Sequence, residues 1–349
     1  MDTKDKTDIR ALSKEAILAF FTEKGEPAFR ANQVYQWLWQ KGVHDFESMT
    51  NLSKSLRDLL QEHFVINHIN IDRQQRSTDG TLKNAIKLHD GYVVESVLIP
   101  TKTRSTACVS SQVGCSLDCT FCATAALKRM RNLNADEIYD QVVAIDQQSR
   151  LYFKRPLTNI VFMGMGEPLM NYNQVLLAID KITHPEGLAM SPRRITLSTS
   201  GIPKMIQKLA DDGVKFELAV SLHSARQEVR EQIMPFAKQF PLEDLKAALL
   251  HWYATTKKRI TFEYIVFKGV NDTDEDIEAL VRFCTNIPSK VNIIEYNTID
   301  DATLSQAAPD RVEAYIAALN RFKISVTYRR SRGKDIDAAC GQLANKIDL

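Results

Sequence analysis

A regular alternation of strand-like and helix-like segments constrains the fold of this chain more than any other feature. From Ser105 onward, short runs rich in β-branched residues alternate with longer amphipathic stretches, for example RRITLSTS at 193–200 and ADEIYDQVVAIDQQ at 135–148. Such alternation favours an α/β fold in which helices cover a parallel sheet, arranged either as a barrel or as a doubly wound sheet. In both arrangements the functional side chains gather at the carboxyl ends of the strands.

The preceding part of the chain follows two other patterns. Residues 1–64 contain amphipathic segments with apolar residues at helical spacing, whereas residues 65–104 contain strand-like runs separated by Asp-Gly turn pairs. We therefore expect a helical domain at 1–64, a β-rich connection at 65–104 and a core domain at 105–349. A chain of 349 residues is long enough to bury one large core with a small appended domain.

The charge and hydropathy of the chain exclude few partners but indicate a compartment. Its net charge of +2 is the difference between 45 basic and 43 acidic residues, so any nucleic-acid surface must be local. No apolar run approaches the roughly 20 residues of a membrane span, and the polar start is no signal peptide. We therefore expect a cytoplasmic protein without a membrane partner, whose six cysteines are ligands, catalysts or core residues rather than disulfides.

Three of the cysteines, Cys115, Cys119 and Cys122, lie close together after the first strand of the alternating region. Three thiolates can hold three irons of a [4Fe–4S] cluster and leave the fourth iron without a protein ligand. That iron can bind S-adenosylmethionine (SAM) and deliver an electron to its sulfonium, which gives a 5′-deoxyadenosyl radical. A zinc site would usually have a fourth Cys or His ligand, and a structural trio of cysteines is the other alternative. The C-x3-C-x2-C spacing, with an aromatic residue before the last cysteine, resembles the radical-SAM signature, and we interpret the trio as cluster ligands.

The segment Gly164–Pro168 (GMGEP), after the next strand, resembles the SAM-binding strand end of the same superfamily. Its glycines let the backbone approach a ligand closely, and the Glu167 carboxylate can accept hydrogen bonds from the ammonium group of SAM. Hydroxyl and amide groups at later strand ends suit the ribose and carboxylate of SAM. The residues there are Ser198, Ser221, His223 and Asn297. His223 fits a hydrogen-bonded core histidine equally well.

Five segments together resemble one family within this superfamily. They are FRANQVYQWLWQKG at 29–42, CVSSQVGCSLDCTFCAT at 108–124, GMGEPLMNY at 164–172, SLHS at 221–224 and DIDAACGQL at 335–343. On these motifs the chain resembles the RlmN/Cfr family of radical-SAM RNA adenine methyltransferases over nearly its whole length. The resemblance implies an α/β fold with a partial (β/α)6-type TIM barrel, a small N-terminal helical domain that assists RNA binding, and a short β extension.

The resemblance also implies roles for two cysteines outside the trio and for one glutamate. One molecule of SAM would methylate Cys340, and a radical from a second molecule would take a hydrogen atom from its S-methyl group. The carbon radical would add to an adenine ring carbon, since polar transfer between two electrophilic carbons fails. Cys108 would then attack the thioether sulfur and release methylated RNA, leaving a disulfide. Glu95 matches the family's proton acceptor for the ring hydrogen, and its alternative interpretation is an exposed strand carboxylate.

The family's SAM-binding positions correspond to residues at several strand ends. They are Gly166, Glu167, Ser198, Ser221, Leu222, His223 and Asn297. The chain departs from many relatives at 297–300 (NTID), where they have Asn-Pro followed by a glycine-containing loop. The resemblance further implies two molecules of SAM per turnover, an external flavodoxin-like or ferredoxin-like reductant, and a monomeric enzyme.

The substrate implied by the resemblance is C2 of adenine, in 23S rRNA at the peptidyl-transferase centre and in tRNA next to the anticodon. The alternative within the family is Cfr-type methylation of C8, which confers antibiotic resistance. Two other functional classes of protein remain open. A different radical-SAM enzyme would leave Cys108 and Cys340 dispensable, and an RNA-binding protein with a structural cluster would have no open iron for SAM.

Basic residues next to aromatic ones in the first 64 residues suit structured RNA. The basic residues are Lys24, Arg30, Lys41, Lys54 and Arg57, and the aromatic ones are Tyr35, Trp37 and Trp39. We expect the aromatic side chains in the core of the helical domain, while the charges fit both a solvated face and phosphate contacts. The basic segments 128–131 and 328–334 lie beside the cysteine trio and Cys340 and are better phosphate-contact candidates. Cys284, on an amphipathic segment, is expected in the core.

Overall fold

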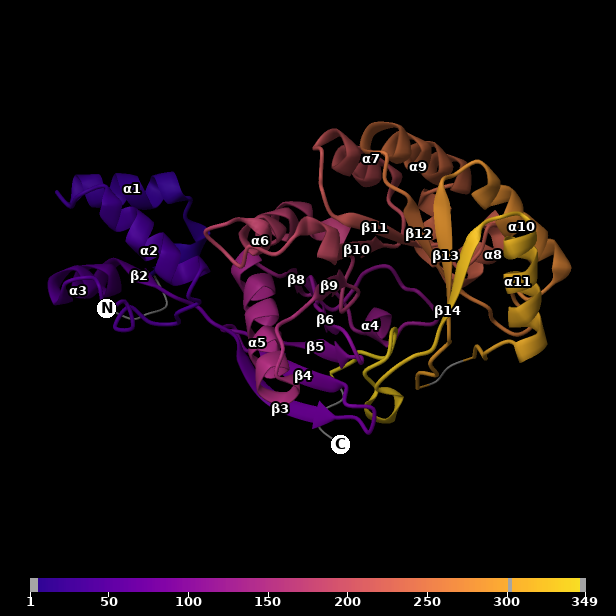
Figure 1. The fold of residues 1–349 in the computed structure, drawn as a ribbon, viewed down its shortest axis with the longest axis horizontal. Coiled ribbons are helices and arrows are strands. Elements are labelled where there is room, and N and C mark those ends of the chain that lie inside the picture. Colours follow the sequence, from indigo (N-terminus) through magenta and orange to yellow (C-terminus); the bar gives the residue numbers. More distant parts are fainter. Residues whose placement is uncertain (1–5, 301–302, 346–349) are drawn as a thin grey trace.

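The structure, a computed structural model, describes residues 6–300 and 303–345, and its central feature is one sheet of ten strands (Figure 1). In their order across the sheet the strands are β14 (Ser325–Arg329), β13 (Ser289–Ile294), β12 (Ile260–Ile265), β11 (Glu217–Ser221), β10 (Ile195–Thr199), β9 (Asn159–Phe162), β6 (Ser105–Cys108), β5 (Val93–Pro100), β4 (Leu82–Lys87) and β3 (Asn70–Arg76). Because β14 and β3 form its two edges, this sheet stays an open, partial barrel.

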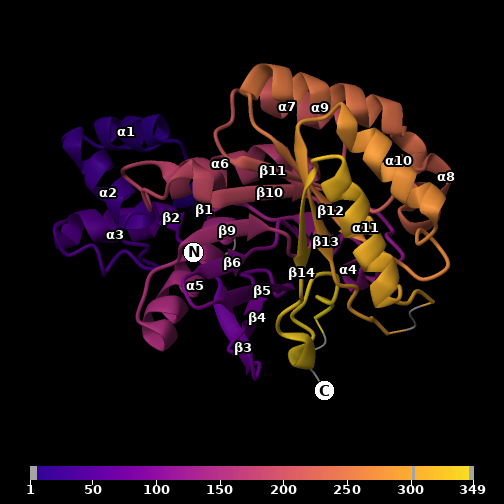
Figure 2. The same ribbon diagram turned by 45° about the vertical axis from the view of Figure 1, so that its right-hand side comes forward.

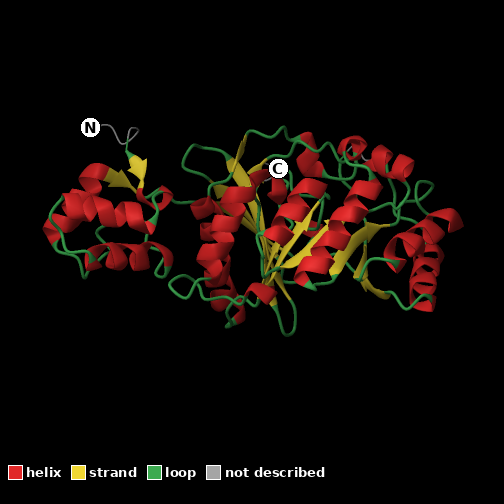
Figure 3. Ribbon diagram, turned by 90° about the horizontal axis from the view of Figure 1, so that it is seen from above, coloured by secondary structure: helices red, strands yellow, loops and turns green. Residues whose placement is uncertain are grey.

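Within this sheet, each pair of neighbouring strands on the side from β6 across to β14 is parallel. Helices return the chain from one of these strands to the next. The helices are α5 (Ala135–Phe153), α6 (Tyr172–Thr183), α7 (Pro203–Asp211), α8 (Gln227–Ile233), α9 (Leu242–Thr256), α10 (Asp274–Thr285) and α11 (Pro309–Arg321). Seen from above, the strands lie in the middle with helices around them (Figure 3). The inner face of the sheet is therefore free to build a site.

Strands β3, β4 and β5 continue the sheet beyond β6 with antiparallel pairing. Their two hairpin turns contain Gly80 (φ 88°) and Gly91 (φ 89°), a left-handed backbone that other residues rarely adopt. Figure 2 shows the C-terminal segment returning beside this extension, where the Ala344 amide donates a hydrogen bond to Glu95 on β5. The extension therefore supports the end of the chain that carries Cys340.

Three helices, α1 (Lys14–Glu23), α2 (Phe29–Trp39) and α3 (Lys54–His63), form a unit beside the barrel (Figure 1). A buried ion pair attaches this unit to the barrel, because Arg10 Nη1 donates to Asp140 Oδ1 on α5 at 2.7 Å. The neighbouring hydroxyl of Tyr139 donates to the Trp39 carbonyl. The helical unit is thus tied to the outer face of the barrel and not to its interior.

The predicted fold class, a partial α/β barrel with an N-terminal helical unit and a β extension, is confirmed. Helix α5 continues to Phe153, beyond the predicted end at 148. Short elements lie outside the prediction, because two to four residues are too few to show a period. They are the strand pair β1 (Thr7–Asp8) and β2 (Phe64–Val65), the pair β7 (Gln112–Val113) and β8 (Arg131–Asn132), and helix α4 (Ala123–Ala126).

Several predictions about single side chains can be checked against their exposure. Tyr35 and Trp39 are 7% and 1% exposed and belong to the main core, as predicted. Trp37 is only partly buried, and Lys41 Nζ lies 3.3 Å from the centre of its ring. Cys284, predicted in the core, is buried on α10. Among the residues that the structure describes, no helix is both long enough and apolar enough to span a membrane.

Candidate active site

Two cavities meet inside the open barrel. The larger, of about 790 Å³, extends along the inner face of the sheet, and we call it the barrel cavity; Cys108 lies in its wall. The smaller, of about 160 Å³, lies at the carboxyl ends of the strands, and we call it the cofactor cavity; Cys115, Cys119 and Cys122 line it. Cys340 lines both cavities. A group carried on Cys340 can therefore meet a ligand in either one.

The three cysteines of the cofactor cavity lie on the loop between β7 and α4, which we call the cluster loop. Hydrogen bonds fix this loop from two sides, because the Ala123 amide donates to the Gly341 carbonyl at 2.7 Å and the Thr120 amide donates to the Ile233 carbonyl at 3.0 Å. Burial raises the pKa of Cys115 to about 11 and also raises the pKa values of the other two thiols. These thiols must therefore lose protons when they bind a metal.

The three thiols line one cavity, as the ligands of a [4Fe–4S] cluster do, since each thiolate of such a cluster binds a different iron. Within residues 6–300 and 303–345, no three His, Cys, Asp or Glu side chains converge closely enough to hold one metal ion. Glycines, hydroxyls and a carboxylate line the same cavity, and these groups suit SAM.

The turn after β9 brings Gly166 and Glu167 to the cofactor cavity. Gly166 has φ 95°, and a Cβ at this position would lie 2.5 Å from Gln112 Cβ, so a side chain is excluded. The buried Glu167 carboxylate accepts hydrogen bonds from Thr199 Oγ1 at 2.7 Å and from the Ser200 amide and hydroxyl at 2.7 and 2.8 Å. Burial raises the pKa of Glu167, and these hydrogen bonds oppose the shift. Thr199 and Ser200 are cavity residues that sequence reasoning did not single out.

Ser198 on β10, Ser221 at the end of β11 and His223 also line the cofactor cavity. His223 Nδ1 accepts a hydrogen bond from the Ile265 amide at 3.2 Å, and its ring contacts Phe121 edge-on at 4.7 Å between centroids. Burial lowers the pKa of His223 to about 3, so the ring is neutral. His223 is therefore a hydrogen-bonded core histidine and part of the cavity wall at once.

Two predicted SAM-binding residues lie outside the walls of the cofactor cavity. Leu222 packs in the main core, and its amide donates to the Glu263 carbonyl at 3.0 Å. Asn297 is buried, and its Nδ2 donates to the Cys340 carbonyl at 3.1 Å. Its Oδ1 has no hydrogen-bond partner among the described residues. Asn297 thus holds the backbone of Cys340 and keeps one free acceptor beside it.

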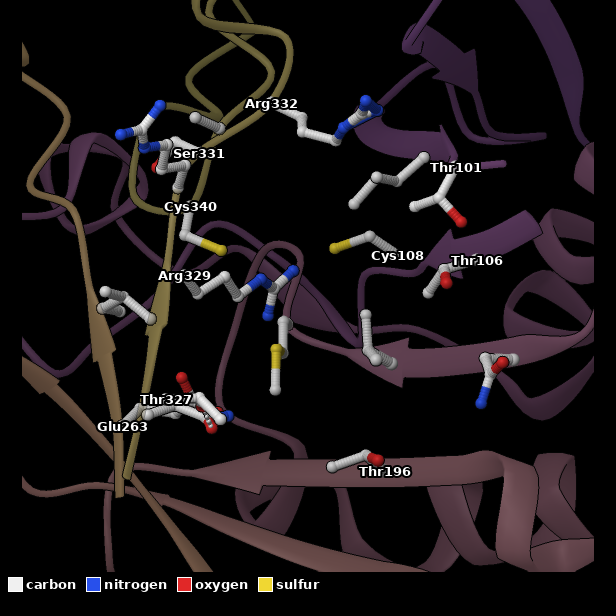
Figure 4. A pocket seen from close by; sticks show the side chains of 18 of the residues that line it. Thr101, Thr106, Cys108, Thr196, Glu263, Thr327, Arg329, Ser331, Arg332 and Cys340 are labelled. Atoms are coloured by element: carbon white, nitrogen blue, oxygen red, sulfur yellow. Dashed lines mark hydrogen bonds between the residues drawn. The ribbon is translucent and has the colours of Figure 1, made fainter. Parts of the chain in front are cut away.

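Cys108 and Cys340 approach each other on either side of Arg329, whose guanidinium lies between them (Figure 4). Cys108 is 6% exposed, whereas Cys340, although surrounded by protein, exposes its side chain to the cavities. Burial raises the pKa of Cys108 to about 12 and also raises the pKa of Cys340. The Arg329 guanidinium opposes both shifts, and Cys340 and Glu263 in turn raise the pKa of Arg329. One cation at the end of β14 therefore favours both thiolates.

Glu95 lines neither cavity, because it is fully buried on β5. Its Oε1 lies 3.4 Å from Lys83 Nζ, and its Oε2 accepts hydrogen bonds from the Ala344 amide at 2.8 Å and the Asn345 amide at 3.1 Å. The alternative interpretation of Glu95 as an exposed strand carboxylate is therefore wrong. The carboxylate anchors the segment that follows Cys340, a role that sequence reasoning did not anticipate.

The structure reduces the number of phosphate-contact candidates in the two predicted basic segments. In 128–131, Arg131 forms two hydrogen bonds of 2.8 Å with Glu137 and one of 2.5 Å with Asp90, so its guanidinium is already occupied. In 328–334, Arg329 points between the two thiols instead of outward (Figure 4). Other arginines remain at the wall of the barrel cavity. They are Arg104, Arg330 and Arg332.

Comparisons with known proteins agree with this geometry. The family model described as the ribosomal RNA large subunit methyltransferase N-terminal domain matches residues 7–66, and that of the radical SAM superfamily matches residues 109–284. The chain is 69% identical to a probable dual-specificity RNA methyltransferase RlmN from Christiangramia forsetii, over 98% of this chain and 97% of that protein. It is 42% identical to the dual-specificity RNA methyltransferase RlmN of Geotalea uraniireducens, over 99% and 98% of the two chains.

A solved structure is similar over the same extent. The crystal structure of a radical SAM methyltransferase from Sphaerobacter thermophilus matches with a TM-score of 0.90 and 36% sequence identity. The match covers 97% of this chain and 99% of that one, so it includes the helical unit, the β extension and the barrel together.

Proposed function

The chain belongs to the RlmN family of radical SAM RNA methyltransferases, and on that premise we propose that it methylates C2 of adenine in 23S rRNA and of the adenine next to the anticodon in tRNA. The relatives bear the dual-specificity RlmN name, so methylation of C8 by a Cfr-type reaction is the disfavoured alternative. The observation that carries the proposal is the position of Cys340, which lines both the cofactor cavity and the barrel cavity.

The cofactor cavity supplies the radical chemistry that the superfamily implies. When held by Cys115, Cys119 and Cys122, a [4Fe–4S] cluster provides an electron for the cleavage of SAM and thereby a 5′-deoxyadenosyl radical. Glu167 and the backbone at Gly166 face the same cavity and would bind the methionine part of SAM. The neighbouring hydroxyl groups would bind its ribose and carboxylate.

Cys340 carries the methyl group between the two substrates. Its thiolate attacks the methyl carbon of one SAM, forming an S–CH3 bond and releasing S-adenosylhomocysteine. The S-methyl group then loses a hydrogen atom to the radical that is derived from a second SAM molecule. The resulting carbon radical on Cys340 adds to C2 of an adenine in the barrel cavity. Return of one electron to the oxidised cluster and loss of the C2 proton to a base would complete a thioether adduct. Two molecules of SAM are therefore consumed in each turnover.

Glu95 is the proposed acceptor of the C2 proton. In the described structure its carboxylate accepts hydrogen bonds from the Ala344 and Asn345 amides, on the segment that follows Cys340. To reach the adenine, the carboxylate must exchange these amides for the substrate. Proton transfer is therefore coupled to a rearrangement of the segment that carries the methyl group.

Cys108 resolves the adduct. Its thiolate attacks the Cys340 sulfur, so that an S–S bond forms while the S–CH2 bond breaks. The electron pair of the broken bond stays on the carbon, which takes up a proton and becomes the methyl group of the product. Arg329 favours the attacking thiolate. An external flavodoxin-like or ferredoxin-like reductant would supply the electrons for the cluster, and two electrons from an external thiol reductant would reduce the disulfide and complete the cycle.

The helical unit at residues 1–64 would act as an accessory RNA-binding domain in a cytoplasmic, monomeric enzyme. Its match to an N-terminal domain of ribosomal RNA methyltransferases supports this assignment. The arginines at the wall of the barrel cavity would contact phosphates next to the adenine. The adenine has to be unstacked from its neighbours to enter the cavity, at a cost of a few kcal/mol.

The product of the reaction tests the proposal. Reduced, cluster-replete protein is incubated with SAM and either 23S rRNA or tRNA, and the RNA is digested to nucleosides for mass spectrometry. We expect 2-methyladenosine from both RNAs, the same product from the Cys284→Ala control, and none from Cys340→Ala. 8-Methyladenosine would identify the Cfr-type alternative, and the absence of both products from a cluster-replete sample would contradict the proposal.

A further inference from the structure

Arg230 on α8 is a fully buried cation that pairs with backbone carbonyls. Its Nη2 donates to the Ser200 carbonyl at 2.6 Å and to the Ser221 carbonyl at 3.5 Å, and its Nε donates to the Leu222 carbonyl at 3.3 Å. Its Nη1 is buried without any hydrogen-bond partner among the described residues. Among the described residues, no carboxylate forms an ion pair or a hydrogen bond with it.

A buried charge is costly unless an opposite charge compensates it. The carbonyl dipoles at the ends of β10 and β11 compensate Arg230 in part. No full negative charge balances the guanidinium in this buried region, and Arg230 Nη1 keeps an unused hydrogen-bond donor among the described residues. A negative charge on the neighbouring Cys119 thiol raises the pKa of Arg230 against the effect of burial. Burial lowers that pKa to about 10, so the guanidinium stays charged at neutral pH.

Helix α8 places Arg230 directly beside the cluster loop. One turn after Arg230, the Ile233 carbonyl accepts hydrogen bonds from Thr120 N at 3.0 Å and Thr120 Oγ1 at 3.3 Å, and Thr120 follows Cys119 in the chain. Ile233 and Phe236 belong to a small apolar cluster against which Cys119 packs. The helix that carries the cation is thereby held against the cluster loop.

We propose that Arg230 is the electrostatic partner of the iron–sulfur cluster and favours its reduced state. Thiolate ligands are negative, and reduction adds one further negative charge, so a fixed cation nearby stabilises the reduced form more than the oxidised form. The low dielectric of the buried site strengthens this effect. Arg230 is a positioning residue, because it also ties together the strand ends that carry Ser200 and Ser221 in the cofactor cavity. The inference rests on the radical SAM assignment but not on the identity of the RNA.

The reduction potential of the cluster tests the inference without any turnover. Arg230→Gln removes the charge and keeps an amide donor for the Ser200 carbonyl, while Arg230→Lys keeps the charge. Arg226→Gln is the matched control, since Arg226 precedes the same helix but lies at the surface, 2.8 Å from Glu228. Reconstituted full-length proteins are titrated with a reductant and followed by electron paramagnetic resonance, and their iron content is measured.

We expect the ratio of reduced to oxidised cluster in Arg230→Gln to fall about tenfold at a fixed potential, a shift of about 59 mV to more negative values for one electron. Arg230→Lys and Arg226→Gln should titrate within twofold of the unmodified protein. A Gln variant with full iron content and an unchanged titration would overturn the inference.

If the Gln variant binds little iron, the Lys variant decides the question. A Lys variant with normal iron content and potential supports the role of the charge, and one as defective as the Gln variant overturns it. An unmodified protein that binds no cluster would instead refute the iron–sulfur assignment itself.

Discussion

The burial of Cys108 makes the rate of adduct resolution steeply dependent on pH. Only the thiolate attacks the Cys340 sulfur, and burial raises the pKa of Cys108 to about 12. At pH 7 about one molecule in 100,000 then carries the thiolate, and at pH 9 about one in 1,000. Release of methylated RNA from the adduct should therefore accelerate about 100-fold between these two pH values, with no plateau between them.

Arg329 should determine the rate of adduct resolution at each pH but not how steeply that rate rises with pH. Its guanidinium lowers the pKa of Cys108 against the effect of burial, so Arg329→Gln should reduce the thiolate fraction at every pH. A pKa that is higher by one unit slows resolution about tenfold, and we expect a change of that order. Arg282→Gln, at the surface of α10 beside Glu278, is the matched control and should leave the rate unchanged.

A pH jump measures the profile. The protein–RNA adduct is allowed to form at pH 7, the pH is raised to a series of values up to 9, and samples are quenched with acid. Adduct and free RNA are separated on denaturing gels. A release rate that does not change with pH, or that levels off near pH 8, would refute the argument from burial. Equal rates for Arg329→Gln and the unmodified protein would refute the role of the cation.

Five further substitutions have definite expected results. Cys340→Ala should form no covalent adduct and Cys108→Ala should accumulate one on denaturing gels; an adduct in the first variant would contradict the role of that thiol. Glu95→Ala should speed amide hydrogen exchange of the C-terminal segment that it anchors, and unchanged exchange would contradict the anchoring. It should also lower the free energy of unfolding by about 3–5 kcal/mol, because the buried Lys83 ammonium loses its partner. Gly166→Ala should abolish SAM binding in calorimetry without loss of iron, because the added Cβ would lie 2.5 Å from a neighbouring side chain. Arg10→Met should destabilise the protein by about 3–5 kcal/mol in chemical denaturation, since it leaves a buried carboxylate unpaired; a change below about 1 kcal/mol would contradict that estimate.

The strand–helix alternation was sufficient to predict a parallel sheet covered by helices, because the long helices and the strands have clear periods. The choice of a partial barrel over a doubly wound sheet rested on the family resemblance. The three cysteines of the cluster loop were assigned from their spacing, which is rare outside metal and redox chemistry. Cys340 was assigned from the family resemblance of the segment 335–343. The structure adds the meeting of the two cavities at Cys340, which depends on how the C-terminal segment returns to the barrel. That return depends on contacts with Glu95, which is far from Ala344 in the sequence.

The electrostatic partners of the site could not be predicted. Arg230 donates hydrogen bonds to backbone carbonyls. Because every residue has a backbone carbonyl, no sequence pattern identifies the partners of this arginine. Arg329 lies in a basic segment that also suits contact with phosphate. Its position between two thiols shows that it stabilises thiolates instead (Figure 4). Arg131 shows the opposite case, because a basic residue suited to RNA is consumed by two carboxylates inside the protein.

The central claim is that the methyl group reaches RNA by way of Cys340. Protein without a prior methyl group is incubated with RNA and with SAM whose methyl group carries three deuterium atoms, and the product nucleoside is analysed by mass spectrometry. Hydrogen abstraction from the S-methyl group of Cys340 removes one deuterium, so we expect 2-methyladenosine with two deuterium atoms in its methyl group. A product that retains three deuterium atoms would show direct transfer from SAM and would refute the role of Cys340.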